Sequence, residues 1–125
     1  MLRKRDPYDA YQRVEFDARV RGANAAELVH VCYDQFVNAL GAALVADQRR
    51  DALLRSRSLT RALTAVMALQ LGVDHEHDMA GALGEFYGAA RMSVLASSLS
   101  FDRARLEEIR KDFTEVRDGF ALARA

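Results

Sequence analysis

The stretch Asp-His-Glu-His-Asp at residues 74–78 gathers residue types that bind metal ions. Metal sites in helical bundles use ligands three or four residues apart on facing helices, as in Glu-x-x-His pairs. His75 and His77 are two residues apart, and no other predicted helix offers a matching histidine. We therefore expect no metal site here, but a solvated turn in which Asp78 caps the helix that follows.

His30 raises a second possibility, a phosphorelay bundle in which an exposed histidine accepts a phosphoryl group. Such a histidine is expected to have lysine and glycine close behind it, whereas Val31, Cys32 and Tyr33 follow here. We expect His30 to be a partly exposed residue on the polar side of its helix. A metal-binding or phosphorelay bundle remains the alternative from the enzyme and signalling classes.

Cys32 is the one cysteine of the chain, so no internal disulfide can form and a reducing compartment is expected. It falls on the apolar side of a predicted helix, where a buried thiol packs as a small apolar side chain. The sequence contains no Gly-rich phosphate loop and no candidate Ser-His-Asp set. These observations predict a protein that is not an enzyme and needs no cofactor.

The composition is that of a globular domain, with 125 residues, of which 50% are apolar and 29% charged. The 18 basic and 18 acidic residues balance, so no concentrated basic surface is available for nucleic acid. No apolar run approaches the roughly 18 residues that span a bilayer. The charged start MLRKRD is not followed by the apolar stretch of a signal peptide. We expect a cytoplasmic protein without membrane insertion.

Apolar residues at helical spacing predict a first helix that begins at a capping box of Asn24 and Glu27 and ends near Val45. Its apolar ridge is Leu28, Cys32, Phe36, Leu40 and Leu44. A second helix should begin near Asp51 and end at Gly72, with the next residue packing back on it. Its buried side is predicted to be Leu59, Ala62, Leu63, Val66, Leu69 and Val73.

A third helix is predicted after the polar turn, closed by the serine-rich residues 97–100. Its apolar side is predicted to be Met79, Leu83, Phe86, Tyr87, Ala90, Val94 and Leu95. The last helix has apolar residues in steps of 3, 4, 3 and 4, which is heptad spacing. These residues are Leu106, Ile109, Phe113, Val116 and Phe120.

Four helices with one apolar stripe each, joined by short polar turns, pack best as an antiparallel bundle. The sequence therefore predicts an all-α fold with a four-helix bundle at residues 23–125. Together with residues 1–22, this bundle is expected to form a single domain. Residues 1–22 form an N-terminal arm or cap. Because this arm carries apolar side chains near a chain end, we expect it or a short helix within it to pack on the bundle. Its apolar residues are Tyr8, Tyr11, Val14, Phe16 and Val20.

Several short motifs resemble the FliS family of flagellin-export chaperones. The opening DPYDAYQ is similar to the family's N/D-P-Y-x-x-Y segment, the helix start NAAELV to its T/S-P-x-E-L, and CYDQF to its L-Y-D/N. Phe86 and Tyr87 resemble the Leu-Tyr of the third helix, and residues 116–120 the closing L-R-x-A-W. The resemblance runs from about residue 6 to residue 120. The directly matching positions are Pro7, Tyr8, Tyr11, Glu27, Leu28, Tyr33 and Asp34.

The resemblance implies a cytoplasmic chaperone that binds the disordered C-terminal segment of flagellin. Binding would prevent premature polymerisation and keep flagellin competent for flagellar type III export. Components of the export gate are further partners that the resemblance implies. The alternative is an adaptor bundle that binds another amphipathic helix.

A groove that receives an apolar arm can also receive an apolar helix of another chain. We expect the arm to occupy this groove until flagellin displaces it; the alternative is that the tyrosines are a fixed lid. An arm exchanged between copies would give a weak homodimer, so the free protein is expected to be a monomer or a weak homodimer. The candidate residues of arm and groove are Tyr8, Tyr11, Val14, Met67, Leu71, Ile109, Phe113 and Val116.

Overall fold

The structure, a computed structural model, describes residues 25–76 and 78–124. This part of the chain contains helices and turns and no strand, which confirms the predicted all-α fold. The helices are α2 (Ala25–Gln48), α3 (Ala52–Leu71), α4 (Ala80–Leu99) and α5 (Arg103–Arg124). The predicted arm, and with it Asn24 of the capping box, lies outside the described residues. The division into an arm and a bundle therefore stays a prediction.

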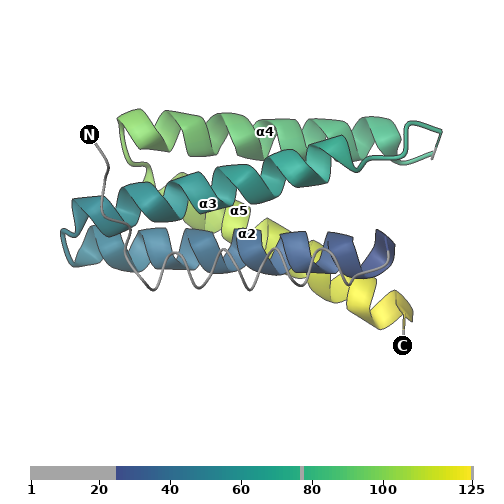
Figure 1. The fold of residues 1–125 in the computed structure, drawn as a ribbon, viewed down its shortest axis with the longest axis horizontal. Helices are drawn as coiled ribbons and strands as arrows, with labels where there is room; N and C mark the ends of the chain where they lie inside the picture. Colours follow the sequence, from purple (N-terminus) through teal and green to yellow (C-terminus); the bar gives the residue numbers. More distant parts are fainter. Residues whose placement is uncertain (1–24, 77, 125) are drawn as a thin grey trace, which may run out of the picture.

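The four helices pack side by side as an antiparallel bundle, as predicted (Figure 1). α2 packs against both α3 and α5, and α3 packs against α4. α4 and α5 touch each other much less than the other neighbouring pairs do. The bundle is therefore held together mainly through the central pair α2 and α3, with α5 packed on α2 and α4 packed on α3.

The turn between α2 and α3 is a helix-ending motif with two backbone hydrogen bonds. The Asp51 N–H donates to the Ala46 carbonyl at 2.9 Å, and the Arg50 N–H donates to the Asp47 carbonyl at 3.1 Å. This is the Schellman pattern, which requires a left-handed residue at its turning point. Arg50 supplies it with a φ of 56°. α2 consequently runs to Gln48, slightly beyond the predicted end.

The other helix ends agree with the sequence at two places and disagree at one. The Asp51 carboxylate accepts a hydrogen bond from the Leu54 N–H at 3.0 Å and caps α3. α3 ends at Gly72 as predicted, and Val73 packs against the core. The prediction that Asp78 caps the third helix was wrong. The capping position is Met79, whose side chain makes no capping hydrogen bond.

The core consists of one face from each helix, and the predicted stripes of α2 and α3 form it largely as expected. On α4, however, Met79 and Leu95 are exposed, although the spacing placed them on the buried side. Phe120 of α5 is also 41% exposed, because the core contacts fade toward the end of that helix. The largest fully buried side chains are Tyr33, Phe36, Leu40, Val66, Val94, Leu106 and Phe113.

α2 is long and apolar enough to resemble a membrane span over Ala26–Gln48, by length and composition alone. The expectation that no stretch approaches this length was therefore wrong. In the structure the helix lies between α3 and α5, and its ridge residues Phe36 and Leu40 are fully buried against them. A central core helix needs the same apolar composition as a span, so this one feature is weak evidence for a membrane segment.

The left-handed Arg50 gives a direct test of the turn. A non-glycine residue in this conformation lowers the stability of the folded protein by roughly 1–2 kcal/mol. Glycine removes this penalty, but it also makes the unfolded chain more flexible, which cancels part of the gain. We expect Arg50→Gly to raise the free energy of unfolding by about 0.5–1 kcal/mol in chemical denaturation. Arg49→Gly, one residue earlier and without a positive φ, is the control. An equal gain from both variants would contradict this account.

Candidate partner-binding surface

The structure separates the predicted groove residues into two groups. Ile109 and Phe113 of α5 are core side chains, only 3% and 1% exposed, and do not face a partner in this arrangement. Val116 is partly buried and packs against the same core. Met67 and Leu71 lie on the opposite side of α3 from its core residues and are exposed, Leu71 at 86%. Tyr8, Tyr11 and Val14 lie outside the described residues.

Where the structure describes them, the residues considered for metal or catalytic chemistry are not gathered into a site. His75 and Glu76 lie in the turn before α4, where the Glu76 N–H donates to the Asp74 carboxylate at 3.0 Å. His77 is outside the described part. Within residues 25–76 and 78–124, no three His, Cys, Asp or Glu side chains come close enough to hold a metal ion.

His30 and Cys32 have ordinary structural roles. His30 Nε2 lies 3.2 Å from the Asp34 carboxylate one turn along α2, and Arg117 of α5 contacts the other oxygen of that carboxylate at 3.0 Å. Cys32 is buried, and burial raises the pKa of its thiol. A protonated, enclosed thiol is a poor nucleophile and a poor metal ligand.

The outward side of α3 carries a stripe of residues at heptad spacing, which we call the outer stripe of α3. It consists of Leu53, Arg57, Thr60, Thr64, Met67 and Leu71. At a rise of 1.5 Å per residue it extends for about 27 Å along the helix. Leu53, Met67 and Leu71 are among the exposed large apolar side chains of the protein. The stripe contains one charged residue, Arg57, so most of it can be buried by a partner without removing charges from water.

The two threonines in the middle of the outer stripe of α3 are compatible with an apolar partner. The Thr60 hydroxyl donates to the Ser56 carbonyl at 3.1 Å, and the Thr64 hydroxyl donates to the Thr60 carbonyl at 3.0 Å. Because their own helix accepts these protons, neither hydroxyl donor needs a bond from a partner. The stripe can therefore be covered by an apolar helix at little polar cost.

An aromatic cluster in the core holds α2, α4 and α5 together. The Phe113 ring of α5 lies 4.3 Å from the Phe36 ring of α2 and 4.4 Å from the Phe86 ring of α4, centroid to centroid. The Phe86 and Phe113 rings are stacked, with an interplanar angle of 16°. Tyr33 also meets the Phe120 ring edge-on at 5.7 Å. These contacts supply much of the link between α4 and α5, which otherwise touch sparsely.

Two buried tyrosines add a polar link to the cluster. The hydroxyls of Tyr33 on α2 and Tyr87 on α4 form a hydrogen bond of 2.9 Å. Burial raises the pKa of Tyr33 strongly, helped by this bond, and burial also raises the pKa of Tyr87. Both hydroxyls therefore stay protonated in the folded protein. Each satisfies a polar group of the other that would otherwise be buried without a partner.

Three arginines at intervals of seven residues bind α5 to α2. Arg103 donates to the Leu44 carbonyl at 2.7 Å, and Arg110 donates to the Val37 carbonyl at 3.1 Å. Arg117 pairs with Asp34, so the three contacts follow one another along the antiparallel pair. Sequence analysis missed this series, although the heptad spacing of the arginines on α5 was a visible signal.

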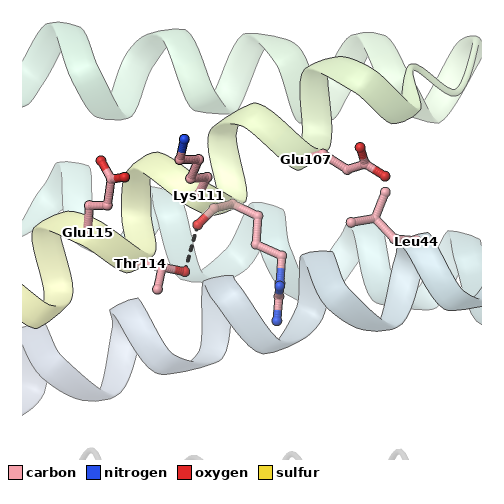
Figure 2. Close-up of a pocket in the computed structure, with 6 residues that line it drawn as sticks. Leu44, Glu107, Lys111, Thr114 and Glu115 are labelled. Carbon is pink, nitrogen blue, oxygen red and sulfur yellow. Dashed lines mark hydrogen bonds between the residues drawn. The ribbon is translucent and has the colours of Figure 1, made fainter.

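Gly41 of α2 leaves the space that Arg110 occupies. A Cβ atom added at Gly41 would lie 3.1 Å from Nε and from a terminal nitrogen of Arg110, which is closer than ordinary contact. The missing side chain thus allows the guanidinium to lie across α2. Beside it, a surface pocket of about 430 Å³ is lined by Leu44, Glu107, Arg110, Lys111, Thr114 and Glu115 (Figure 2).

The pocket has the character of a solvated surface. Its lining carries two acidic and two basic side chains, so it favours neither an anion nor a cation. Arg110 is bonded to α2, and the Thr114 hydroxyl donates to the Arg110 carbonyl at 2.8 Å. The outer stripe of α3 is therefore the stronger candidate for contact with a macromolecular partner.

The structure is thus an all-α bundle with a filled core and, outside it, a long and nearly uncharged helix face of a kind that an amphipathic helix can cover. The chain belongs to the FliS family, since the model described as "Flagellar protein FliS" matches residues 7–125. Members of this family are chaperones in flagellar assembly and export. Among curated proteins, none matches the chain.

The tyrosine pair predicts a non-additive response to mutation. Tyr87→Phe and Tyr33→Phe should each lower the free energy of unfolding by about 1–3 kcal/mol, because each leaves one buried hydroxyl without its partner. The double variant should cost clearly less than the sum of the two. Urea unfolding of the three variants measures this. Strictly additive losses would show that the hydroxyls are not coupled.

The same variants have a defined pH dependence. Because the folded pKa of both tyrosines lies above the ordinary value of 10.0, their contribution to stability is complete below pH 10 and is lost as the pH rises further. The double phenylalanine variant should therefore lose less stability than the natural protein between about pH 9 and pH 11. Parallel curves over this range would contradict the assigned burial of the hydroxyls.

Proposed function

We propose that this protein is a cytoplasmic export chaperone that binds the disordered C-terminal segment of flagellin. Bound flagellin cannot polymerise prematurely and remains competent for flagellar type III export. Membership of the FliS family supports the chaperone role, and the outer stripe of α3 supports the mode of binding. Components of the export gate are the further partners of this proposal.

The outer stripe of α3 is the single observation that carries the binding mode. An amphipathic segment contacts a partner along residues spaced i, i+3, i+4 and i+7, and the outer stripe of α3 has this spacing. Its apolar members are Leu53, Met67 and Leu71, at the two ends of the stripe. Met67 adds an adaptable side chain, suited to partners that do not fit perfectly. Val116 and the partly exposed Phe120 of α5 offer further apolar contact at another face.

Coupled folding explains how such a complex can hold its cargo and still release it. A segment that is disordered when free loses conformational entropy as it becomes ordered on the chaperone. This cost lowers the affinity for a given buried area, so the complex can form in the cytoplasm and open at the export gate. A partner that is already folded and rigid would not lose this conformational entropy on binding, so for the same buried area it would bind more tightly and be harder to release.

The N-terminal arm is assigned the role of a competitor in this proposal. Tyr8, Tyr11 and Val14 would cover apolar surface of the bundle while flagellin is absent, and flagellin would displace them. Tyrosine suits alternating burial, because its ring buries apolar area and its hydroxyl tolerates water.

Calorimetric titration with a C-terminal flagellin fragment tests the proposal. We expect a saturable one-to-one isotherm with a strongly negative heat-capacity change. Leu71→Asp and Met67→Asp should each weaken binding by about tenfold or more, because each places a carboxylate in the apolar contact. Val45→Asp on α2, an apolar position about as exposed as Met67, is the control and should bind normally.

The outcomes separate the alternatives. Absence of binding by the folded protein would overturn the flagellin-chaperone assignment. Equal binding of an unrelated amphipathic peptide would favour a general adaptor. Normal flagellin binding by both stripe variants would leave the chaperone role standing and move its site away from α3.

Deletion of residues 1–16 tests the arm. If the arm competes with flagellin, the truncated protein should bind the flagellin fragment more tightly than, or as tightly as, the full chain. A large loss of affinity would show instead that the arm is part of the binding site. The helix content of the truncated protein, measured by circular dichroism, is the control for folding.

A further inference from the structure

The charges along α3 and its two turns are distributed unevenly, although the charges of the whole chain cancel. Residues 49–61 carry five arginines and one acidic residue, whereas residues 62–90 carry four acidic residues and neither lysine nor arginine. We call this arrangement the charge gradient of α3. Its members are Arg49, Arg50, Arg55, Arg57 and Arg61 at the basic end, and Asp74, Glu76, Asp78 and Glu85 at the acidic end.

The two ends of the charge gradient lie at the two ends of the outer stripe of α3. The α2–α3 turn, with Arg49 and Arg50, comes just before Leu53 of the stripe, and the α3–α4 turn comes directly after Leu71 (Figure 1). The 20 residues of α3 separate these turns by about 30 Å. Arg91, the next cation along the chain, lies midway along α4 and belongs to neither end.

The charges at both ends can reach a partner. All four acidic side chains of the acidic end are exposed. At the basic end Arg49 and Arg50 are exposed, whereas Arg55 pairs with Asp47. The acidic residue at this end, Asp51, uses its carboxylate to accept the N–H of its own helix. The basic end therefore keeps two accessible guanidinium groups beside the stripe.

The backbone at Arg50 is a second observation at the basic end. Arg50 has a φ of 56°, a conformation that glycine adopts more easily than any residue with a side chain. The chain thus carries a guanidinium at a position where the backbone favours a residue without one. A role of this guanidinium in binding would account for the strain.

We propose that the charge gradient of α3 orients a helical segment bound on the outer stripe of α3. The segment carries opposite charges at its two ends, so that its basic end lies over the acidic turn and its acidic end lies beside Arg49 and Arg50. The place of binding rests on the proposed function. The charge pattern of the segment and its direction on α3 go beyond that function.

The apolar contact by itself does not set a direction. A stripe spaced i, i+3, i+4 and i+7 can be covered by a helix that runs either way along it, because the spacing is almost the same from both ends. Charges remove this ambiguity, since like charges placed opposite each other are unfavourable and opposite charges are favourable. At physiological ionic strength a charge acts over about 8 Å, so each end of the segment senses only the nearer end of α3.

Two synthetic amphipathic peptides of about 20 residues, the length of α3, test the direction. They share the same apolar positions; one has lysines in its N-terminal third and glutamates in its C-terminal third, and the other has these charges exchanged. A paramagnetic label at the peptide N-terminus broadens nearby amide signals of the isotope-labelled full chain. We expect the lysine-first peptide to broaden residues 72–76 and the glutamate-first peptide to broaden residues 49–53. Broadening of the same end by both peptides would overturn the proposal.

Charge-reversal variants test the gradient itself. Arg49→Glu/Arg50→Glu and Glu76→Lys/Asp78→Lys should each raise the Kd of either peptide about tenfold at low salt and less at high salt. Asp74 stays unchanged because its carboxylate accepts the Glu76 N–H within the turn. Lys111→Glu, an exposed change on α5, is the control and should bind normally.

The variant with all four substitutions separates charge recognition from damage to the fold. Its gradient is reversed, so it should regain the affinity that each double variant loses and should bind each peptide in the opposite direction. Damage to the fold would instead add up over the four changes. A fourfold variant that binds no better than the double variants would overturn the proposal.

The C-terminal flagellin fragment keeps this inference distinct from the proposed function. Flagellin binding by a protein that shows neither peptide direction nor sensitivity to the charge reversals would overturn the orienting gradient and leave the chaperone role standing. Oriented peptide binding by a protein that does not bind flagellin would support the gradient and overturn the flagellin assignment.

Discussion

The packing of the Phe113 ring against rings of two other helices is the contact on which the rest of the bundle depends. α4 and α5 share little surface elsewhere, so Phe113, in contact with Phe36 and Phe86, connects the two edges of the structure through α2. The hydrogen bond between Tyr33 and Tyr87 fixes the same region by a directional contact. A ring can slide along an apolar surface, whereas a pair of hydroxyls has one favourable position.

The polar contacts between α5 and α2 fix the register that these rings require. Each arginine contact is partly exposed and contributes little to stability by itself. Their value lies in their spacing, because Arg103 and Arg110 bond to carbonyl groups that are themselves seven residues apart on α2. A shift of one turn would separate both pairs at once. Asp47 of α2 also forms an ion pair with Arg55, which links α3 to the same region of α2.

The core of the bundle is formed by one face of each helix, and some apolar side chains on the other faces remain exposed to water. α3 presents a long face with one charge, which suits an amphipathic segment of a chaperone's cargo. The outward side of α4 likewise leaves large apolar side chains exposed, among them Met92 and Leu99.

The sequence by itself determined the four helices of residues 25–76 and 78–124, most of their ends, and the core positions of α2 and α3, because apolar period and capping chemistry are local properties. Heptad spacing on α5 likewise identified Leu106, Ile109 and Phe113 as one face. Heptad spacing could not show whether this face of α5 packs in the core or binds a partner, because both kinds of contact require apolar residues at the same spacing. On α4 the predicted side was right for Tyr87, Ala90 and Val94 and wrong for Leu95. Apolar residues also lie on the outward side of this helix, and spacing alone does not separate the two sides there. The positions of Met92, Leu95 and Leu99 in water, and the crossing of Arg110 over Gly41, depend on contacts between distant segments. Only the tertiary structure could decide them.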